Sequence, residues 1–276
     1  MRILLLGLAV LIALALTTQA EAKIIVPNDY PTIQQAINAA SPGETIVVKD
    51  GTYVENVKVN KSVTIISENG SANCIVQVVR SYDNVFEITA DNVTISGFTI
   101  TGAAAAGYIS AGIYIEANNS VITNNNVTNN NDGIQLWNSN NNTITNNNII
   151  NNEWYGIWLS NSNNNSITKN NIENNSWCGK YGTGIYSDDS NNNTIYLNNF
   201  NNTNNIATFG SINYFNATKP ITYQYNGKTF TSYLGNYWSD YKGFDSNNDG
   251  IGDEPYVIDW YNCLLYTSDA ADDGES

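Results

Sequence analysis

Residues 119–141 read NSVITNNNVTNNNDGIQLWNSNN, residues 142–164 read NTITNNNIINNEWYGIWLSNSNN, and residues 165–192 repeat the pattern with an insertion. One isoleucine marks each cycle at intervals of 30, 27, 22, 23 and 28 residues, at Ile65, Ile95, Ile122, Ile144, Ile167 and Ile195. A Gly-Ile pair recurs in the same way, beginning at Gly112, Gly133, Gly156 and Gly184. Such a period is typical of a solenoid, in which each unit buries its apolar face against its neighbours.

Within each cycle the apolar residues form short alternating clusters, such as residues 134–136 and 157–159, separated by Asn-rich corners. This alternation indicates strands and not helices. Because short strands and corners fill one cycle, the pattern predicts an all-β fold, a right-handed parallel β-helix solenoid. Asn tolerates the left-handed backbone region at corners, and stacked Asn side chains form amide ladders. Disorder, the alternative for an Asn-rich tract, would not keep an apolar residue in register at each turn.

Residues 32–40, TIQQAINAA, place Ile33, Ala36, Ile37 and Ala40 on one helical face. A solenoid needs a cover at its open end, because its first coil otherwise exposes an edge and an apolar core. We therefore predict a short N-terminal capping helix, a first coil after it, and a β-helix over residues 23–235.

Both ends of the chain differ from the repeats. Residues 1–22 combine Arg2, an unbroken apolar run and an Ala-Glu-Ala sequence, which predicts a secretory signal peptide cleaved before Lys23. The run is shorter than the roughly 20 residues of a spanning helix, the alternative for such a stretch. Residues 263–276, which begin CLLYTSDAADD, resemble a translated sequencing adapter. We interpret them as an artefact, with a natural acidic tail as the alternative.

Composition narrows the function classes. The chain has 25 acidic and 11 basic residues, a formal net charge of −14, no His and a single Met. Residues 23–262 alone hold 20 acidic and 10 basic residues, which argues against nucleic acid as a partner, because its phosphates require Lys and Arg. The lack of His excludes imidazole-based catalysis and argues against a soft-metal site.

Two cysteines lie within the repeats, Cys74 and Cys178. At one strand spacing per coil they are roughly 19 Å apart, whereas a disulfide needs Cα atoms within about 7 Å. We predict two unpaired thiols.

The strongest local motif is DSNNDGIGD at residues 245–253, within an acidic closing segment at residues 236–262. Its oxygen ligands match the spacing of an EF-hand calcium loop, although Tyr256 stands where that loop has its last Glu. We predict a structural Ca²⁺ site, with a metal-free polar turn as the alternative. The predicted ligands are Asp245, Asn247, Asp249, Ile251 through its carbonyl, and Asp253.

If the isoleucine of each Gly-Ile pair points inward, the next residue points outward. One outward column then holds Tyr114, Gln135, Trp158 and Tyr186, and a second holds Glu116, Trp137, Ser160 and Asp188. Rings one coil apart, flanked by amides and carboxylates, suit stacking against sugars. A ring ladder that only stabilises the fold is the alternative. The predicted ligand-binding residues are Tyr114, Gln135, Trp137, Trp158 and Tyr186.

A polysaccharide lyase or glycoside hydrolase acting on an acidic polysaccharide is the competing function. Asp188 and Asp189 are the candidate catalytic residues, since they resemble the paired aspartates of β-helix polygalacturonases, but the His-containing and Arg-Lys motifs of those enzymes are missing. Two-carboxylate glycosidases hold their carboxyls about 5 to 9.5 Å apart, whereas Glu116 and Asp188 are roughly 14 Å apart at one strand spacing per coil.

The opening stretch at residues 24–68, the NNTITNNNI repeats and the closing LGNYWSDYKGFDSNNDGIGDEPYVI at residues 234–258 together resemble NosD-like β-helix proteins, also described as carbohydrate-binding and sugar-hydrolase repeats. The resemblance implies a pectate-lyase-like fold and a surface or periplasmic location. The namesake is linked to copper delivery. Because this chain lacks the His and internal Met that copper requires, we expect no copper role.

These observations predict a secreted protein, extracellular or at the cell surface, and periplasmic if the host has an outer membrane. The predicted function is non-catalytic recognition of a polysaccharide or cell-envelope glycan, or a structural role in the envelope. No membrane span is expected in the mature part of the chain, and the sequence does not define the oligomeric state.

Overall fold

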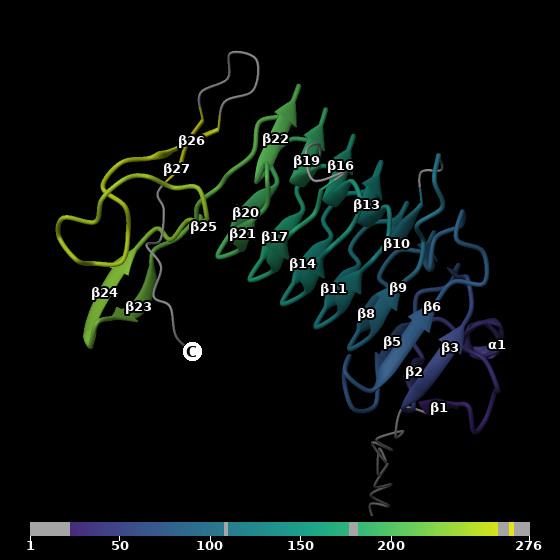
Figure 1. Ribbon diagram of the computed structural model, residues 1–276. Helices are drawn as coiled ribbons and strands as arrows, with labels where there is room; N and C mark the ends of the chain where they lie inside the picture. The colour runs from purple at the N-terminus through teal and green to yellow at the C-terminus, as the bar shows by residue number, and fades with distance from the viewer. Residues whose placement is uncertain (1–22, 108–109, 177–181, 259–264, 268–276) are drawn as a thin grey trace, which may run out of the picture.

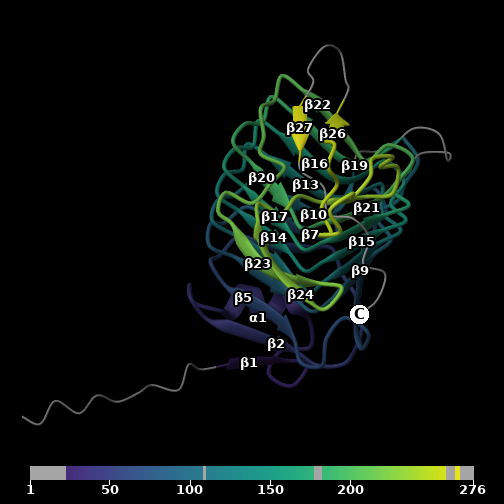
Figure 2. The same ribbon diagram turned by 90° about the vertical axis from the view of Figure 1, so that its left-hand side faces the viewer.

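The computed structural model describes residues 23–107, 110–176, 182–258 and 265–267. Its described part contains one short helix and three parallel sheets that wind into a solenoid (Figure 1). Each coil contributes one strand to each sheet in turn, and Figure 2 shows the coils superposed along the stack. The predicted parallel β-helix is confirmed. The predicted signal peptide and Cys178 lie outside the described residues.

The sheets are named in the order in which the chain visits them. The first holds, in spatial order, β1 (Lys23–Val26), β2 (Thr45–Val48), β5 (Thr64–Ser67), β8 (Thr94–Ser96), β11 (Val121–Thr123), β14 (Thr143–Thr145), β17 (Ser166–Thr168) and β20 (Thr194–Tyr196). The second holds β3 (Gly51–Val54), β6 (Cys74–Gln77), β9 (Thr99–Thr101), β12 (Asn126–Thr128), β15 (Asn148–Ile150), β18 (Asn171–Glu173), β21 (Asn199–Asn201) and β25 (Tyr237–Trp238). The third holds β4 (Val57–Val59), β7 (Phe86–Ile88), β10 (Ala111–Ile115), β13 (Asp132–Trp137), β16 (Tyr155–Ser160), β19 (Thr183–Asp188) and β22 (Ile206–Phe209).

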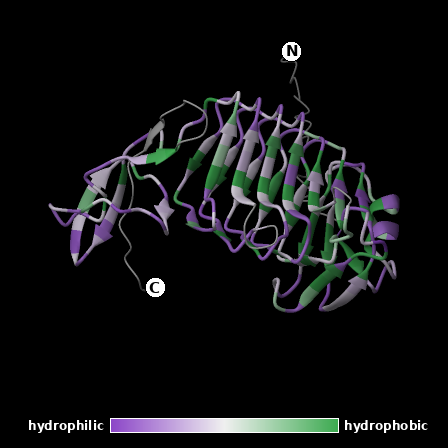
Figure 3. Cartoon of the chain, turned by 45° about the horizontal axis from the view of Figure 1, so that its top comes forward, coloured by the Kyte–Doolittle hydropathy of each residue, from purple (hydrophilic) through white to green (hydrophobic). Residues whose placement is uncertain are grey.

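Isoleucines of successive coils lie in register, as the repeat predicts. Ile122 pairs with Ile144 in the first sheet, and Ile134 pairs with Ile157 in the third. All four side chains are fully buried and belong to one core that follows the axis. Figure 3 shows hydrophobic residues on the strands and mainly hydrophilic residues at the turns. Burial of each such side chain contributes about 1.5–3 kcal/mol.

Pairs of asparagines turn the chain at the corners. In the pairs Asn124-Asn125 and Asn146-Asn147 the first residue has φ of 57° and 55°, a left-handed conformation that Asn tolerates. The second residue points inward, so that Asn125 Nδ2 donates to Asn147 Oδ1 at 3.1 Å. This amide ladder runs through Asn125, Asn147, Asn170, Asn198 and Asn236.

Two further ladders follow the other two corners. One contains Asn130, Asn152, Asn175, Asn202 and Asn205. The other contains Asn142, Asn165, Asn193 and Asn213. Ladder amides also donate to backbone carbonyls of the preceding coil, which satisfies buried polar groups that would otherwise be costly. The Asn-rich composition is therefore part of the core.

The helix α1 (Ile33–Ala39) covers the N-terminal end, as predicted. Thr32 caps it by accepting the Gln35 backbone N–H at 3.2 Å, and its face of Ile33, Ala36 and Ile37 is fully buried. The first coil begins before the helix and not after it, because β1 pairs with β2. No helix in the described part of the chain is long and apolar enough to cross a membrane.

The C-terminal end is closed by the segment that follows Leu234. Trp238 stacks between Phe200 and Tyr256, with ring centroids 4.6 Å and 4.3 Å away. Asp240 accepts hydrogen bonds from the Asn205 side chain at 2.7 Å and from the Tyr256 hydroxyl at 3.1 Å. The closing motif thus extends both the apolar core and a ladder.

An antiparallel hairpin of β23 (Ile221–Tyr225) and β24 (Lys228–Ser232) forms a separate sheet beside this end (Figure 1). The predicted solenoid, residues 23–235, includes this segment, which the structure places outside the stack. Its turn, Asn226-Gly227, has φ of 48° and 73°. An Asn-Gly pair between two alternating stretches is the sequence signal for such a hairpin.

The last described elements are β26 (Tyr256–Ile258) and β27 (Leu265–Thr267), which pair antiparallel. Apart from β27, the stretch interpreted as an artefact lies outside the described residues.

Candidate functional site

The outer face of the third sheet carries the columns that the sequence predicts. Strand pairing aligns one column in the order Tyr114, Gln135, Trp158 and Tyr186. It aligns the other as Trp137, Ser160 and Asp188, with Glu116 directly after β10. The isoleucine before each member of the first column is fully buried, so alternation turns that member outward.

Five rings make contact on this face and form what we name the aromatic cluster: Trp137, Trp154, Tyr155, Trp158 and Tyr186. Tyr155 and Tyr186 stack with centroids 4.9 Å apart and an interplanar angle of 14°. Trp137 meets Trp158 edge to face at 6.4 Å. Trp137 is 37% exposed and Trp154 is 42% exposed. The sheet therefore presents two indoles to solvent from a rigid support.

The repeat pattern misses Trp154 and Tyr155. A Cβ on Gly156 would lie 2.6 Å from the Gly184 carbonyl oxygen and 2.9 Å from Ile172 Cγ2, so this position faces the interior. Tyr155, one residue earlier, therefore faces outward. The signal available in the sequence is the aromatic pair directly before the Gly-Ile pair of this coil.

Three predicted members of the site are less accessible than the pattern suggests. Gln135 is only 4% exposed, and Tyr114 and Trp158 are half-buried. Trp158 Nε1 is buried without a hydrogen-bond partner in the described structure. An unsatisfied buried donor costs about 1–3 kcal/mol, which a phenyl ring at this position would avoid.

Asp132 is a site residue that the sequence analysis did not identify. It begins β13 with only 3% of its surface exposed, and its Oδ1 accepts the Tyr155 backbone N–H at 3.2 Å. Burial raises the pKa of the Asp132 carboxyl to about 7. Nothing in the repeat marks this position, because neighbouring coils have Ala111, Tyr155 and Thr183 there.

The predicted catalytic pair does not form a two-carboxylate site with Glu116. Asp188 ends β19 on the outer face, and burial together with the nearby Asp189 raises its pKa. Asp189 has φ of 45° and donates its backbone N–H to the Phe209 carbonyl at 2.9 Å, so it forms a corner. Trp137 and Ser160 separate Glu116 from Asp188 in the column.

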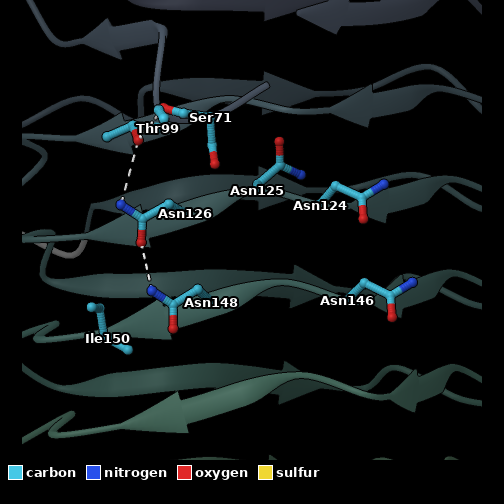
Figure 4. A pocket seen from close by; sticks show the side chains of 9 residues that line it. Ser71, Thr99, Asn124, Asn125, Asn126, Asn146, Asn148 and Ile150 are labelled. Carbon is cyan, nitrogen blue, oxygen red and sulfur yellow. Dashed lines mark hydrogen bonds between the residues drawn. The ribbon is translucent and has the colours of Figure 1, made fainter. Parts of the chain in front are cut away.

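The outer face of the second sheet carries a polar groove (Figure 4). Asn126 Nδ2 donates to Thr99 Oγ1 at 3.4 Å, and Asn148 Nδ2 donates to Asn126 Oδ1 at 2.9 Å. Asn171 and Asn199 continue this partly exposed ladder. These amides satisfy one another, and the groove's lining contains no aromatic ring. It is a weaker candidate for a sugar site than the aromatic cluster.

The loop at residues 245–253 is organised by its own side chains. The Asp245 carboxylate accepts the backbone N–H groups of Asp249 and Gly250 at 3.1 Å and 2.9 Å. Asp253 Oδ2 accepts the Ser246 backbone N–H at 2.8 Å, and hydrogen bonding from Ser246 lowers the pKa of Asp253.

The donor set of this loop suits calcium, which takes carboxylate, amide and carbonyl oxygens. Within the described ranges, however, no three groups among Asp, Glu, Cys and His lie close enough together to hold a metal ion. Calcium binding through Asp245, Asp249 and Asp253 would therefore require their carboxylates to move closer together.

The fold and the aromatic cluster define a parallel β-helix protein with an aromatic outer face. The family model described as "Periplasmic copper-binding protein (NosD)" matches residues 37–243, and the chain belongs to this NosD family. This match confirms the family resemblance that the opening, repeat and closing motifs indicate.

A curated relative covers part of the chain. Over 89 residues the chain is 42% identical to a cell surface glycoprotein of Methanothermus fervidus (strain ATCC 43054 / DSM 2088 / JCM 10308 / V24 S). The alignment spans 32% of this chain and 14% of the relative's length.

Among solved structures, rice weevil pectin methyl esterase is 14% identical, with a TM-score of 0.48 over 65% of this chain and 69% of that one. The Dettilon tailspike protein is 16% identical, with a TM-score of 0.48 over 70% and 46%. An alginate lyase from Paenibacillus sp. is 21% identical, with a TM-score of 0.42 over 65% and 61%. Likenesses at this level carry no argument about function.

The family description names copper, but the residues present do not suit it. The sequence has no His, and its single Met is residue 1. Cys74 is free and fully buried, and burial raises the pKa of its thiol to about 12. A buried neutral thiol without imidazole or thioether neighbours is a poor copper site.

Proposed function

We propose that this chain is a surface or cell-envelope β-helix protein that binds a glycan through the aromatic cluster without cleaving it. The observation that carries the proposal is the pair of partly exposed indoles, Trp137 and Trp154, beside the stacked rings of Tyr155 and Tyr186. Parallel strands hold these side chains at a spacing of about 4.8 Å. Aromatic rings present large apolar faces, which suit the C–H faces of sugars.

Two comparisons support a location at the cell envelope. The relative from Methanothermus fervidus bears the description "Cell surface glycoprotein", and the family description is periplasmic. Export through the predicted signal peptide is consistent with both.

Glycan-array binding tests the proposal. We expect the wild-type chain to bind, and Trp137→Ala to lose binding while its far-ultraviolet circular dichroism stays unchanged. Phe244→Ala is the matched control, because Phe244 is 76% exposed and lies outside the cluster. Binding that survives Trp137→Ala, or is lost equally in Phe244→Ala, would contradict the proposal.

A polysaccharide-degrading enzyme is the second candidate, and Asp132 is the observation that favours it. The Asp132 carboxyl is joined to the aromatic cluster by its hydrogen bond from the Tyr155 N–H, and burial raises its pKa to about 7, as in a general acid. Reducing-sugar release and the absorbance of unsaturated products on a panel of polysaccharides separate the two functions. A binder yields neither signal, whereas an enzyme yields one that Asp132→Asn abolishes.

We also propose that the loop at residues 245–253 binds Ca²⁺ in a structural role. Its ligands would be the side-chain oxygens of Asp245, Asn247, Asp249 and Asp253 and the Ile251 carbonyl. The ion would draw these oxygens together and fix the conformation of the loop within the closing segment.

A further inference from the structure

The aromatic cluster lies among carboxylates. At one side, Glu116 Oε2 accepts a hydrogen bond from the Tyr114 hydroxyl at 3.5 Å. At the other, burial and the charges of Asp188 and Asp189 raise the pKa of Tyr186. Both aspartates therefore lie within electrostatic range of that ring.

Tyr155, in the centre of the cluster, has the same surroundings. Its pKa is raised by burial, by Tyr186 and by the carboxylates of Asp132 and Asp188. Carboxylates thus lie near the cluster on more than one strand of the sheet.

The described strands that carry the aromatic cluster hold no cation. Among the described residues, β10, β13, β16, β19 and β22 contain no Lys or Arg. The nearest cation along the column is Lys58, which is paired with Glu87 at 3.2 Å. Lys58 lies four strands from Trp158, or about 19 Å, and charges separated by more than about 8 Å are largely screened at physiological ionic strength.

We infer that the glycan bound by the aromatic cluster carries no anionic groups and is a neutral or amino-sugar chain, not a uronan. The inference rests on the proposed function and specifies its ligand class. A uronan would bring a carboxylate on each sugar into a field already negative, and the described strands that carry the cluster hold no Lys or Arg to pair with it.

The same surroundings favour hydroxyl and ammonium groups. Ionised carboxylates are acceptors only, so Glu116 and Asp188 match sugar hydroxyl donors. An amino sugar adds charge pairing with these groups and a cation–π contact with the faces of the indoles. The shared requirement is a sugar chain without negative charge.

Isothermal titration with three hexasaccharides of equal length tests the inference: a β-1,4-linked glucose oligomer, a glucosamine oligomer and a galacturonic acid oligomer. We expect the glucose or the glucosamine oligomer to bind at least tenfold more tightly than the galacturonic acid oligomer. Raising the salt concentration from about 20 to about 200 mM strengthens the screening of charge–charge interactions. It should weaken binding of the glucosamine oligomer by about threefold and leave binding of the glucose oligomer unchanged.

Charge-neutralising variants link the discrimination to named residues. In Glu116→Gln and in Asp188→Asn, the ratio of the affinity for the preferred oligomer to the affinity for the galacturonic acid oligomer should fall by about threefold. Such a shift corresponds to the screened interaction of one partly exposed charge. Glu68→Gln is the control of matched charge, because Glu68 is exposed after β5 of the first sheet. It should leave all three affinities unchanged.

The outcomes distinguish failure of this inference from failure of the proposed glycan-binding function. Galacturonate binding that equals or exceeds the others, and that requires Trp137, overturns the inference and leaves glycan recognition intact. Failure of all three oligomers and of the wider glycan array overturns the proposed function, and the inference falls with it.

Discussion

The backbone N–H of Tyr155 donates to the Asp132 carboxyl across two adjacent coils, with an N···Oδ1 distance of 3.2 Å. Tyr155 in turn stacks on Tyr186 of the next coil. A buried acid is thus joined to the aromatic cluster through one strand.

Stability should fall as pH rises through the titration of Asp132. Burial raises the pKa of this carboxyl from its ordinary value near 3.8 to about 7, so the folded chain holds a proton that the unfolded chain releases. The free energy of unfolding should therefore decrease by up to about 4 kcal/mol between pH 4 and pH 7 and change little above that range. Urea denaturation at pH 4 and pH 8 measures the difference.

Asp132→Asn should remove most of this slope, because the amide oxygen still accepts the Tyr155 N–H but does not titrate. Glu68→Gln, at an exposed carboxyl, serves as the control and should keep the slope. An unchanged pH dependence in Asp132→Asn would show that another group is responsible.

The buried amide ladder should contribute more stability than the partly exposed ladder of the second sheet. The Asn147 side chain takes part in five hydrogen bonds inside the corner, whereas Asn148, the next residue, makes two on the outer face. Asn147→Ala leaves several buried groups without partners and should cost about 3 kcal/mol or more; Asn148→Ala should cost about 0.5–1 kcal/mol. Equal losses in chemical denaturation would refute the distinction.

Gly156→Ala should destabilise the stack. The added Cβ would meet the Gly184 carbonyl oxygen at 2.6 Å and Asn175 Nδ2 at 2.9 Å. The first is a backbone atom, and hydrogen bonds of the buried amide ladder hold the second in place. Such overpacking costs about 1–3 kcal/mol. Thermal unfolding of this variant beside Ser166→Ala, on the outer face of the first sheet, measures the cost. A variant as stable as wild type would mean that the coils move apart without penalty.

Calcium should stabilise the C-terminal closure. With a dissociation constant of about 1 mM, in the range of extracellular sites, 10 mM Ca²⁺ adds about 1.4 kcal/mol to the free energy of unfolding. Asp245→Asn should lose this gain, whereas Glu68→Gln should retain it. Calorimetric titration without heat, together with an unchanged melting temperature at millimolar Ca²⁺, would reject the site.

Copper should not bind specifically, despite the description of the family. Titration of the chain with Cu(I) under a competing chelator should show no site of sub-micromolar affinity, because Cys74 is buried and the sequence has no His. Stoichiometric uptake that disappears in Cys74→Ser would overturn this expectation.

Much of the fold could be predicted because a solenoid repeats its local pattern. Alternation around Ile134 and Ile157 predicts strands, and the recurrence of that alternation predicts their register. The Asn226-Gly227 pair between two alternating stretches is a sequence signal from which the hairpin could also be predicted. The start of the first coil could not be predicted, because β1 pairs with β2 across the capping helix and this part of the sequence does not repeat.

The sequence by itself determined the parallel β-helix, its cap and its two outward columns, because these depend on periodicity and strand alternation. Only the tertiary structure decided that Trp154, Tyr155 and Asp132 join the aromatic face and that Gln135 is buried in it. The physical reason is that burial and ring contacts at one coil are set by side chains of the coils above and below, which no local pattern specifies. The low-charge repeats thus became, in three dimensions, an aromatic surface surrounded by carboxylates.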